Sequence, residues 1–458
     1  MEPIQPNSTN TRNDTQLTRR QVLGTAGVAL AGAMVPQNVA LARRSTRHHK
    51  KRRHVIYFEP DGFDPRYLEW FDTPHIDDLI RHGSFTIGRS VFKATSQVAR
   101  ASIITGAYPE VTNHQAYYYD FERQEAIRDE SPSAPEVPLG GETIGQVIKS
   151  TEGVTFAAIA YPQLLNHGAA RDDPEHLYVG APASCSCDDP AAIDAAIDIL
   201  HERPVDVGAG GGLVQVPRIP DLLFVRCVDT DSIGHAEGPF GPSIPGAVAC
   251  IDEQVGRLVQ ATKDVGIYDN TTFIIAADHG MGDISVPLLP DVLDLLDGTR
   301  FSWEVVPWGQ AVSSESIEIV MNATSRSLSI HLRGAAATPK GRKAIAKALS
   351  KVEGRAAVHD RRNLDRLHAG DRVGDFALSA LSPYHLSTDI DRPPGGGHSG
   401  IQETRVPFIM AGAGVRRGFP PRRPEVVDIA PTIAALLRIR RPAQAQGRVL
   451  AEALTGPR

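Results

Sequence analysis

Short apolar segments rich in β-branched and aromatic residues recur along the chain after about residue 53. Nearly every position in them is hydrophobic, which is typical of strands buried on both faces, as in a parallel sheet. Helical patterns separate these segments, so the chain predicts an α/β fold: a doubly wound, mostly parallel sheet with helices on both faces. The predicted strands are His54–Glu59, Thr155–Ala160, Leu222–Cys227, Thr272–Ala277 and Val406–Ala411, and the predicted helices are Thr143–Lys149, Ala191–Leu200, Ala247–Lys263, Lys340–Val352 and Val426–Leu437.

The strand pattern weakens between about Pro287 and Pro394, where two tryptophans and several charged helical patterns occur. We interpret this segment as an insertion that covers a site on the main sheet. A chain of 458 residues can bury one large core together with such an insertion. The predicted organisation is therefore one domain over residues 54–458, with an inserted cap region at about residues 287–394.

Residues 1–42 have the order of an export signal. Arg19 and Arg20 precede an apolar stretch that ends at Pro36, and small residues suited to cleavage follow, up to Ala42. The arginine pair resembles a twin-arginine signal, which is read by the export machinery. The stretch is shorter than the roughly 20 residues of a spanning helix. We expect cleavage near Ala42 and an exported mature chain, periplasmic or extracellular, without a transmembrane segment; a disordered tail or an uncleaved anchor is the alternative.

The charge balance is not that of a nucleic-acid-binding protein. The net charge is −6, and no broad basic surface is expected on the mature domain. The one dense basic run, at residues 43–53, is interpreted as a solvated linker between the signal and the domain.

The four cysteines are too few for a disulfide scaffold in a chain of this length. Cys185 and Cys187 are spaced in a way that could suit a metal, but a polar loop with incidental thiols is the favoured interpretation. Cys227 and Cys250 stand in apolar surroundings and are expected in the core.

Acidic residues and histidines stand beside the ends of several predicted strands. In open α/β sheets, ligands bind at the carboxyl ends of the strands, so these side chains should converge at one edge. Carboxylate oxygen and imidazole nitrogen are good ligands for zinc-like ions. Helix capping is the alternative role for a single aspartate, but the whole set indicates a metal site. Its members are Asp61, Asp231, His235, Asp278, His279 and His398.

A segment with a nucleophile-like hydroxyl carries a specific resemblance. Residues 105–109 read Thr-Gly-Ala-Tyr-Pro, and Ser96 stands nine residues before Thr105. This resembles the alkaline phosphatase superfamily, in particular its type I phosphodiesterase/nucleotide pyrophosphatase branch, whose nucleophile has that spacing from a Thr-Gly-x-Tyr-Pro motif. Asp61-Gly62-Phe63 and the later Asp and His motifs match the branch in order. Thr95, the neighbour of Ser96, is the alternative nucleophile.

The resemblance implies an alkaline-phosphatase-like fold, a small-molecule phosphoester as substrate, and two divalent metal ions, with Zn²⁺ expected. It implies that the Ser96 oxygen attacks phosphorus and forms a phosphoryl-enzyme, with the metals about 4 Å apart for an in-line displacement. By position, the ligands of one ion are Asp231, His235 and His398, and those of the other are Asp61, Asp278 and His279, with Ser96 beside them.

The chain departs from the branch around the nucleophile. Ser96 replaces the usual Thr, and residues 97–99 read Gln-Val-Ala where the branch often has Phe-Pro-Asn. The branch's phosphoryl-contacting Asn falls at Tyr117, although a shifted loop could bring Asn113 to the substrate. Arg100 has two interpretations, a bidentate contact to a phosphoryl oxygen or a salt bridge beneath the nucleophile helix.

Several alternatives share most of these features. A phosphomonoesterase or a phosphonate hydrolase is the nearest. Sulfatases share the nucleophile spacing and the Arg100-Ala101 pair, but they have Pro or Ala where Val98 stands, and their calcium prefers oxygen ligands, whereas this set has three histidines. A non-catalytic protein that keeps metals for stability is the alternative from a different class.

The export signal makes the first prediction. Replacing both Arg19 and Arg20 with Lys keeps the charge but should stop export, because the signal is recognised through the arginine pair. Immunoblots of cytoplasmic and extracytoplasmic fractions measure the effect, and Arg12→Lys serves as a control outside the pair. Unchanged extracytoplasmic accumulation of the double variant would contradict the assignment.

Overall fold

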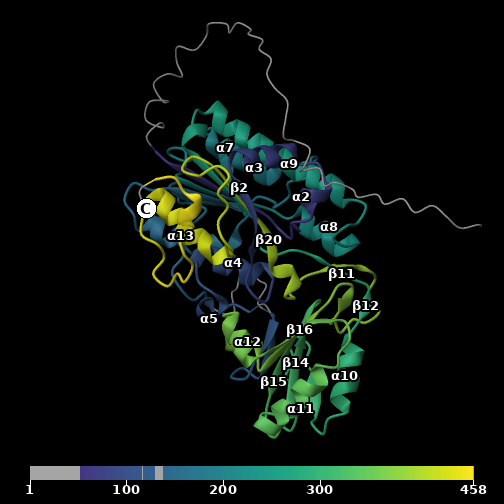
Figure 1. Cartoon of the computed structure of the whole chain (residues 1–458). Coiled ribbons are helices and arrows are strands. Elements are labelled where there is room, and N and C mark those ends of the chain that lie inside the picture. Colours follow the sequence, from purple (N-terminus) through teal and green to yellow (C-terminus); the bar gives the residue numbers. More distant parts are fainter. Residues whose placement is uncertain (1–51, 116, 129–137, 457–458) are drawn as a thin grey trace, which may run out of the picture.

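The computed structural model describes residues 52–115, 117–128 and 138–456. Its centre is a seven-stranded sheet in the order β2-β20-β10-β1-β9-β5-β6 (Figure 1). The pairs from β10 to β6 are parallel, and β20 and β2 are added antiparallel at one edge. The strands are β1 (His54–Pro60), β2 (Ser84–Arg89), β5 (Phe156–Ile159), β6 (His176–Val179), β9 (Leu222–Cys227), β10 (Thr271–Ala276) and β20 (Arg405–Gly412).

Burial on both faces explains why these segments form central strands. All seven residues of β1 and all six of β10 are buried. Two groups of helices cover the sheet (Figure 1). One group comprises α3 (Pro74–His82), α7 (Ala191–Leu200) and α9 (Ile244–Asp264), and the other comprises α4 (Ser96–Thr105), α6 (Ile144–Lys149) and α13 (Ile429–Leu437). The predicted fold class, a doubly wound and mostly parallel α/β sheet, is confirmed.

Two strands of the sheet escaped prediction for a physical reason. The edge strand β2 exposes part of its surface and has no continuous apolar run. Strand β6 is only four residues long, His-Leu-Tyr-Val, so it offers too short a pattern to distinguish from a loop.

Residues within the predicted insertion form a second sheet with its own apolar core (Figure 1). Its order is β13-β14-β15-β17-β16, and helices α10 and α11 pack on it. These elements are α10 (Leu289–Asp297), β13 (Trp303–Val305), β14 (Ile319–Ala323), β15 (Ser327–Leu332), α11 (Pro339–Leu349), β16 (Arg355–Asp360), α12 (Arg361–Arg366) and β17 (Phe376–Ala380).

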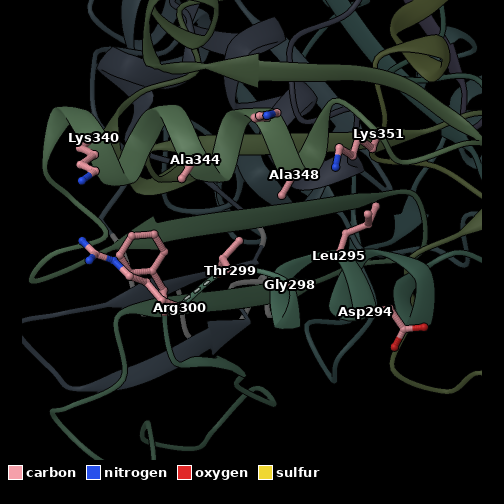
Figure 2. Close-up of a pocket in the computed structure, with 11 residues that line it drawn as sticks. Asp294, Leu295, Gly298, Thr299, Arg300, Lys340, Ala344, Ala348 and Lys351 are labelled. Atoms are coloured by element: carbon pink, nitrogen blue, oxygen red, sulfur yellow. Dashed lines mark hydrogen bonds between the residues drawn. The ribbon is translucent and has the colours of Figure 1, made fainter.

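The buried side chain of Arg326 joins this second sheet to the rest of the protein. Its Nε donates to Glu403 Oε1 at 2.9 Å, and its other nitrogens donate to the carbonyls of Asp283, Ala380 and Tyr384. The turn that precedes Arg326 is therefore held close to the main sheet. A groove of about 390 Å³ lies between α10 and α11, with Lys340 and Lys351 on its rim (Figure 2).

All four cysteines form disulfides, which corrects the interpretation of Cys185 and Cys187 as loop thiols; Cys227 lies in the core as expected. Cys185 pairs with Cys227, and Cys187 pairs with Cys250. The loop before α7 is thus tied both to the end of β9 and to α9. The bridges close separations of 42 and 63 residues, worth about 4 kcal/mol each in the chain-entropy model. Sequence alone could not show this, because each partner is distant along the chain.

The predicted signal at residues 1–42 and nearly all of the linker at residues 43–53 lie outside the described residues. Among the helices of the described ranges, each is too short or too polar to span a bilayer.

Candidate active site

The predicted ligand residues meet at the carboxyl edge of the main sheet. Asp61 follows β1, Asp278 and His279 follow β10, and the short helix α8 (Asp229–Glu237) follows β9. Asp231 and His235 stand four residues apart in α8, so they lie on one face of the helix.

The last ligand residue, His398, reaches the site through a glycine run. Strand β19 (Gly395–Gly397) lies against α8, and a Cβ at Gly396 would stand 2.2 Å from the carbonyl oxygen of Gly234. Only glycine permits this approach of the strand to the helix. It brings His398, the residue after β19, into contact with His235. The sequence showed the run but not the helix that it packs against.

Asp231, His235 and His398 form one group that could hold a cation, with all donor atoms within 4.8 Å of one another. The Nδ1 of His235 bonds the carbonyl of Gly396 at 3.1 Å, and the Nδ1 of His398 bonds the carbonyl of Ala94 at 2.9 Å. Each Nδ1 must therefore carry the proton in the neutral ring, which leaves both Nε2 atoms as acceptors. These two Nε2 atoms face each other at 3.2 Å, an arrangement that a bound cation would stabilise.

A second group comprises Asp61, Asp231 and His279. The Nδ1 of His279 donates to the carbonyl of Gly280 at 2.9 Å, so its Nε2 is also an acceptor. That Nε2 lies 3.0 Å from the Ser96 hydroxyl oxygen, which is 3.5 Å from Asp61 Oδ1. The predicted nucleophile therefore lies beside this second group.

Asp278, predicted to complete the second group, lies beside it and makes further hydrogen bonds. Its Oδ2 is 3.7 Å from His279 Nε2 and accepts from Arg100 at 2.9 Å. Its Oδ1 accepts from the backbone N–H groups of Gly62 and His279 at 3.2 and 3.0 Å. Asp231 belongs to both groups of candidate ligands.

Burial and charge shift the titration of the site. Burial raises the pKa of Asp231 to about 6, and the neighbouring Asp61 acts in the same direction. Burial lowers the pKa of His398 well below its usual value, and two adjacent imidazoles add to the effect. The Oδ1 of Asp231 is also buried without a hydrogen-bond partner. Unprotonated imidazoles around an unpaired carboxylate oxygen are the donors that a zinc-like cation requires.

Arg100 lies beneath the nucleophile helix among three carboxylates. Its side chain is 3% exposed, and it donates to Glu59 Oε1 at 2.6 Å as well as to Asp61 and Asp278. Burial alone would raise the pKa of Asp61, but the guanidinium groups of Arg100 and Arg226 hold it well below its usual range. Burial and Asp61 raise the pKa of Asp278, against the charge of Arg100. This placement is the salt bridge that sequence analysis weighed against a substrate contact.

Sequence analysis missed Glu59, which anchors the other end of Arg100. Glu59 is fully buried, and its Oε2 accepts from the hydroxyls of Tyr57 and Tyr161 at 3.2 and 2.7 Å. Its signal was available, because a carboxylate inside a continuous apolar strand needs a buried partner.

The two candidate nucleophiles differ in their surroundings. Ser96 is the first residue of α4, and its hydroxyl contacts His279 and Asp61. Thr95 is the N-cap of the same helix, 3% exposed, and its Oγ1 has no hydrogen-bond partner. Of the two hydroxyls, only that of Ser96 therefore contacts the second group of candidate ligands.

A cavity of about 550 Å³ opens above Ser96. Asn113, the C-cap of the short helix α5 (Pro109–Thr112), is exposed and is not part of its lining, whereas Tyr117 is. Residues 323–325, from the turn between β14 and β15, also line it. Three arginines of the lining were not singled out from the sequence as a group: Arg128, Arg226 and Arg392.

Residues 55–401 match the family model described as Type I phosphodiesterase / nucleotide pyrophosphatase. The chain belongs to this family. The match covers the first strand, the nucleophile segment, all six ligand residues and the second sheet, and it confirms the resemblance that the motifs indicated.

Individual relatives match over part of their length. The chain is 31% identical over 256 residues to human ectonucleotide pyrophosphatase/phosphodiesterase family member 5, covering 54% of this chain and 49% of that protein. It is 25% identical over 253 residues to the mouse bis(5'-adenosyl)-triphosphatase, covering 53% and 50%. A venom phosphodiesterase of Macrovipera lebetinus matches at 24% over 255 residues, 54% of this chain but only 28% of the venom protein.

The fold is shared with a solved relative. The structure of murine ectonucleotide pyrophosphatase / phosphodiesterase 5 superposes with a TM-score of 0.62 at 18% identity, covering 85% of this chain and 96% of that one. A second structure of the murine protein is that of an inactive variant in complex with AMP.

The buried arginine makes a prediction about stability. Arg100→Met should lower the free energy of unfolding by about 3–5 kcal/mol, because it removes the arginine from the buried Glu59 and Asp278 and leaves Asp61 with Arg226 alone. Urea denaturation in the presence of chelator measures this without a contribution from metals. Arg226→Met should lower the free energy of unfolding less, because this side chain is 17% exposed and its ion pair in the described structure is with Asp61. The double variant Arg100→Met/Glu59→Gln should regain part of the stability that Arg100→Met loses. Equal stability of Arg100→Met and wild type would contradict this role.

Proposed function

We propose that this chain is an exported, two-metal hydrolase of phosphoesters, similar to phosphodiesterases and nucleotide pyrophosphatases, and that Ser96 is its nucleophile. The observation that carries the proposal is the orientation of three imidazoles. His235, His279 and His398 each bind a backbone carbonyl through Nδ1 and direct Nε2 toward the cluster at Ser96. Catalysis is assigned to residues 54–458, with the cap at about residues 287–394.

The ligand set supports two ions. Asp231, His235 and His398 would hold one. Asp61 and His279 would hold the other ion beside Ser96. The third ligand of this ion would be Asp231, or Asp278 in a conformation turned away from Arg100. Zn²⁺ is the proposed metal because three of the six ligands are imidazoles. When bound, such ions lower the pKa of the Ser96 hydroxyl and stabilise negative charge on the phosphoryl and leaving oxygens.

The chain positions the reacting groups as follows. The Ser96 hydroxyl points toward the ligand cluster from the first turn of α4, where the backbone N–H groups have no intrahelical partners. Its hydroxyl proton passes to solvent water, and its oxygen forms a bond to phosphorus as the bond to the leaving oxygen breaks, giving a phosphoryl-enzyme, while the leaving oxygen takes up a proton from water. The N-terminus of α4 favours the negative phosphoryl oxygens beside it. Water then cleaves the Ser96–phosphorus bond and frees the nucleophile.

Export fits the covalent structure. Disulfides persist in oxidising compartments and are rare in the cytosol. Both pairs in this chain, Cys185–Cys227 and Cys187–Cys250, therefore support the proposed route through the signal at residues 1–42 to the periplasm or the cell exterior.

The nucleophile can be tested by three matched variants. Ser96→Ala should lower kcat on a chromogenic phosphodiester by at least about a thousandfold, because the covalent route is lost, while metal content stays at the wild-type value. Ser96→Thr should keep appreciable activity, because the hydroxyl remains, and Thr95→Ala should be mild. Mass spectrometry after an acid quench should find on Ser96 a phosphoryl group that still carries the second ester arm of the diester. Inactivation by Thr95→Ala but not by Ser96→Ala would move the nucleophile to Thr95, and an aldehyde at position 96 would favour a sulfatase.

Metal removal tests the cofactor assignment. Chelation should abolish activity and lower Tm, because ions that bind only the native state stabilise it. At a free metal concentration of about a hundred times Kd, this stabilisation is about 2.7 kcal/mol per site. Zn²⁺ should restore both better than Mg²⁺ or Ca²⁺. Metal analysis should find two ions per chain and only one in His235→Ala. Affinity should fall below pH 6, where protons compete for Asp231, whose pKa is raised to about 6. Full activity in excess chelator, or one ion in the wild type, would contradict the proposal.

A further inference from the structure

Besides Arg100, which is paired with three carboxylates, the cavity above Ser96 is lined by three arginines from separate parts of the chain. Arg226 lies in β9, Arg128 ends the short strand β4 (Glu125–Arg128), and Arg392 stands in the loop before β19. Among the described residues, the candidate ligand Asp231 is the only carboxylate in the lining. The described lining away from the ligand cluster is therefore positive.

The three arginines are not equivalent. Arg226 donates to Asp61 at 2.6 and 3.0 Å, so its charge is already used within the ligand cluster. Arg128 lies with its guanidinium 5.6 Å from the ring centroids of both Tyr117 and Trp308, so two aromatic rings support it beside the cavity.

Arg392 has the least compensation. It is half-buried, and its Nε is shielded from solvent without a hydrogen-bond partner. Across the described ranges it makes no ion pair, even though Asp389 and Asp391 stand next to it in the loop. A shielded guanidinium N–H with no acceptor carries a desolvation cost that a bound acceptor would remove.

The rest of the lining suits a compact polar group. Serine and threonine residues of the cap turn and of the loops on either side of β19 line the cavity together with the arginines, and Tyr117 is the only Phe, Tyr or Trp among the described lining residues. Sites for planar bases commonly depend on apolar and aromatic surfaces. The hydroxyl-bearing residues of the lining outside the nucleophile segment are Thr324, Ser325, Ser387, Thr388 and Ser399.

We propose that Arg392, assisted by Arg128, binds a second anionic group on the substrate. The preferred substrate would then be a small phosphoester that carries a carboxylate or a further phosphate beside the phosphoryl group that Ser96 attacks. Guanidinium groups bind both anions through paired N–H donors. This inference rests on the proposed phosphoester hydrolysis and adds the substrate class.

Matched 4-nitrophenyl phosphodiesters test the inference on the metal-loaded mature protein. Their second arm is propyl, 2-carboxyethyl or 2-phosphonoethyl. Wild type should prefer one or both anionic arms over propyl by about tenfold or more in kcat/KM, the size expected of a charged hydrogen bond. Arg392→Gln should reduce that preference about tenfold, mainly through KM, and Arg392→Lys should reduce it less. Arg417→Gln, at an exposed arginine outside the cavity, should leave rates and preference unchanged.

The outcomes separate the two proposals. Hydrolysis of the propyl diester without preference for either anionic arm, or a preference unaffected by Arg392→Gln, would overturn the inference and leave the hydrolase assignment standing. If none of the diesters is cleaved, the hydrolase assignment fails, and calorimetric binding of 3-phosphonopropionate against propylphosphonate decides the anion site. Tighter binding of the dianionic ligand by wild type, lost in Arg392→Gln, would support the site, and equal binding by both proteins would refute it.

Discussion

The buried contact of Arg100 with Glu59, Asp61 and Asp278 is the constraint on which the active-site edge depends. Three carboxylates at the ends of neighbouring strands could not stay ionised in a region closed to solvent without an internal cation. Because Arg100 stands in α4, the same contact fixes the helix whose first residue is Ser96. The charge that makes the cluster possible thus also positions the nucleophile.

A disulfide and two hydrogen bonds hold Asp231 and His398, two of the other candidate ligands, in place. The loop of Cys185 is tied to the end of β9 by a disulfide, and its backbone N–H donates to Asp229, the first residue of α8, at 2.7 Å. The helix that carries Asp231 is thereby fixed at its start. On the other side, Ser325 of the cap turn donates to the carbonyl of His398 at 2.8 Å. The second sheet therefore supports the ligand cluster as well as lining the cavity above it.

The core strands were predictable because burial on both faces leaves a continuous apolar run, as in β1 and β10. The convergence of the candidate ligands was predictable because their motifs follow those strands directly, as Asp278 and His279 follow β10. Strands with a half-exposed or very short pattern, such as β2 and β6, lack that signal. The position of Asn113 depended on the path of a loop, and its exposed place beside α5 could not be read from spacing.

The sequence by itself determined the class of fold, and it predicted six candidate ligands and the Ser96 hydroxyl of the nucleophile segment. Tertiary structure alone decided the partners: Arg100 with three carboxylates, each cysteine with another far along the chain, and Asp278 with Arg100 and backbone N–H groups as well as with His279. The reason is physical. Periodicity and motifs record the local environment of each residue, whereas these pairings arise when strand order and loop closure bring distant side chains together in a region without water to compete for them.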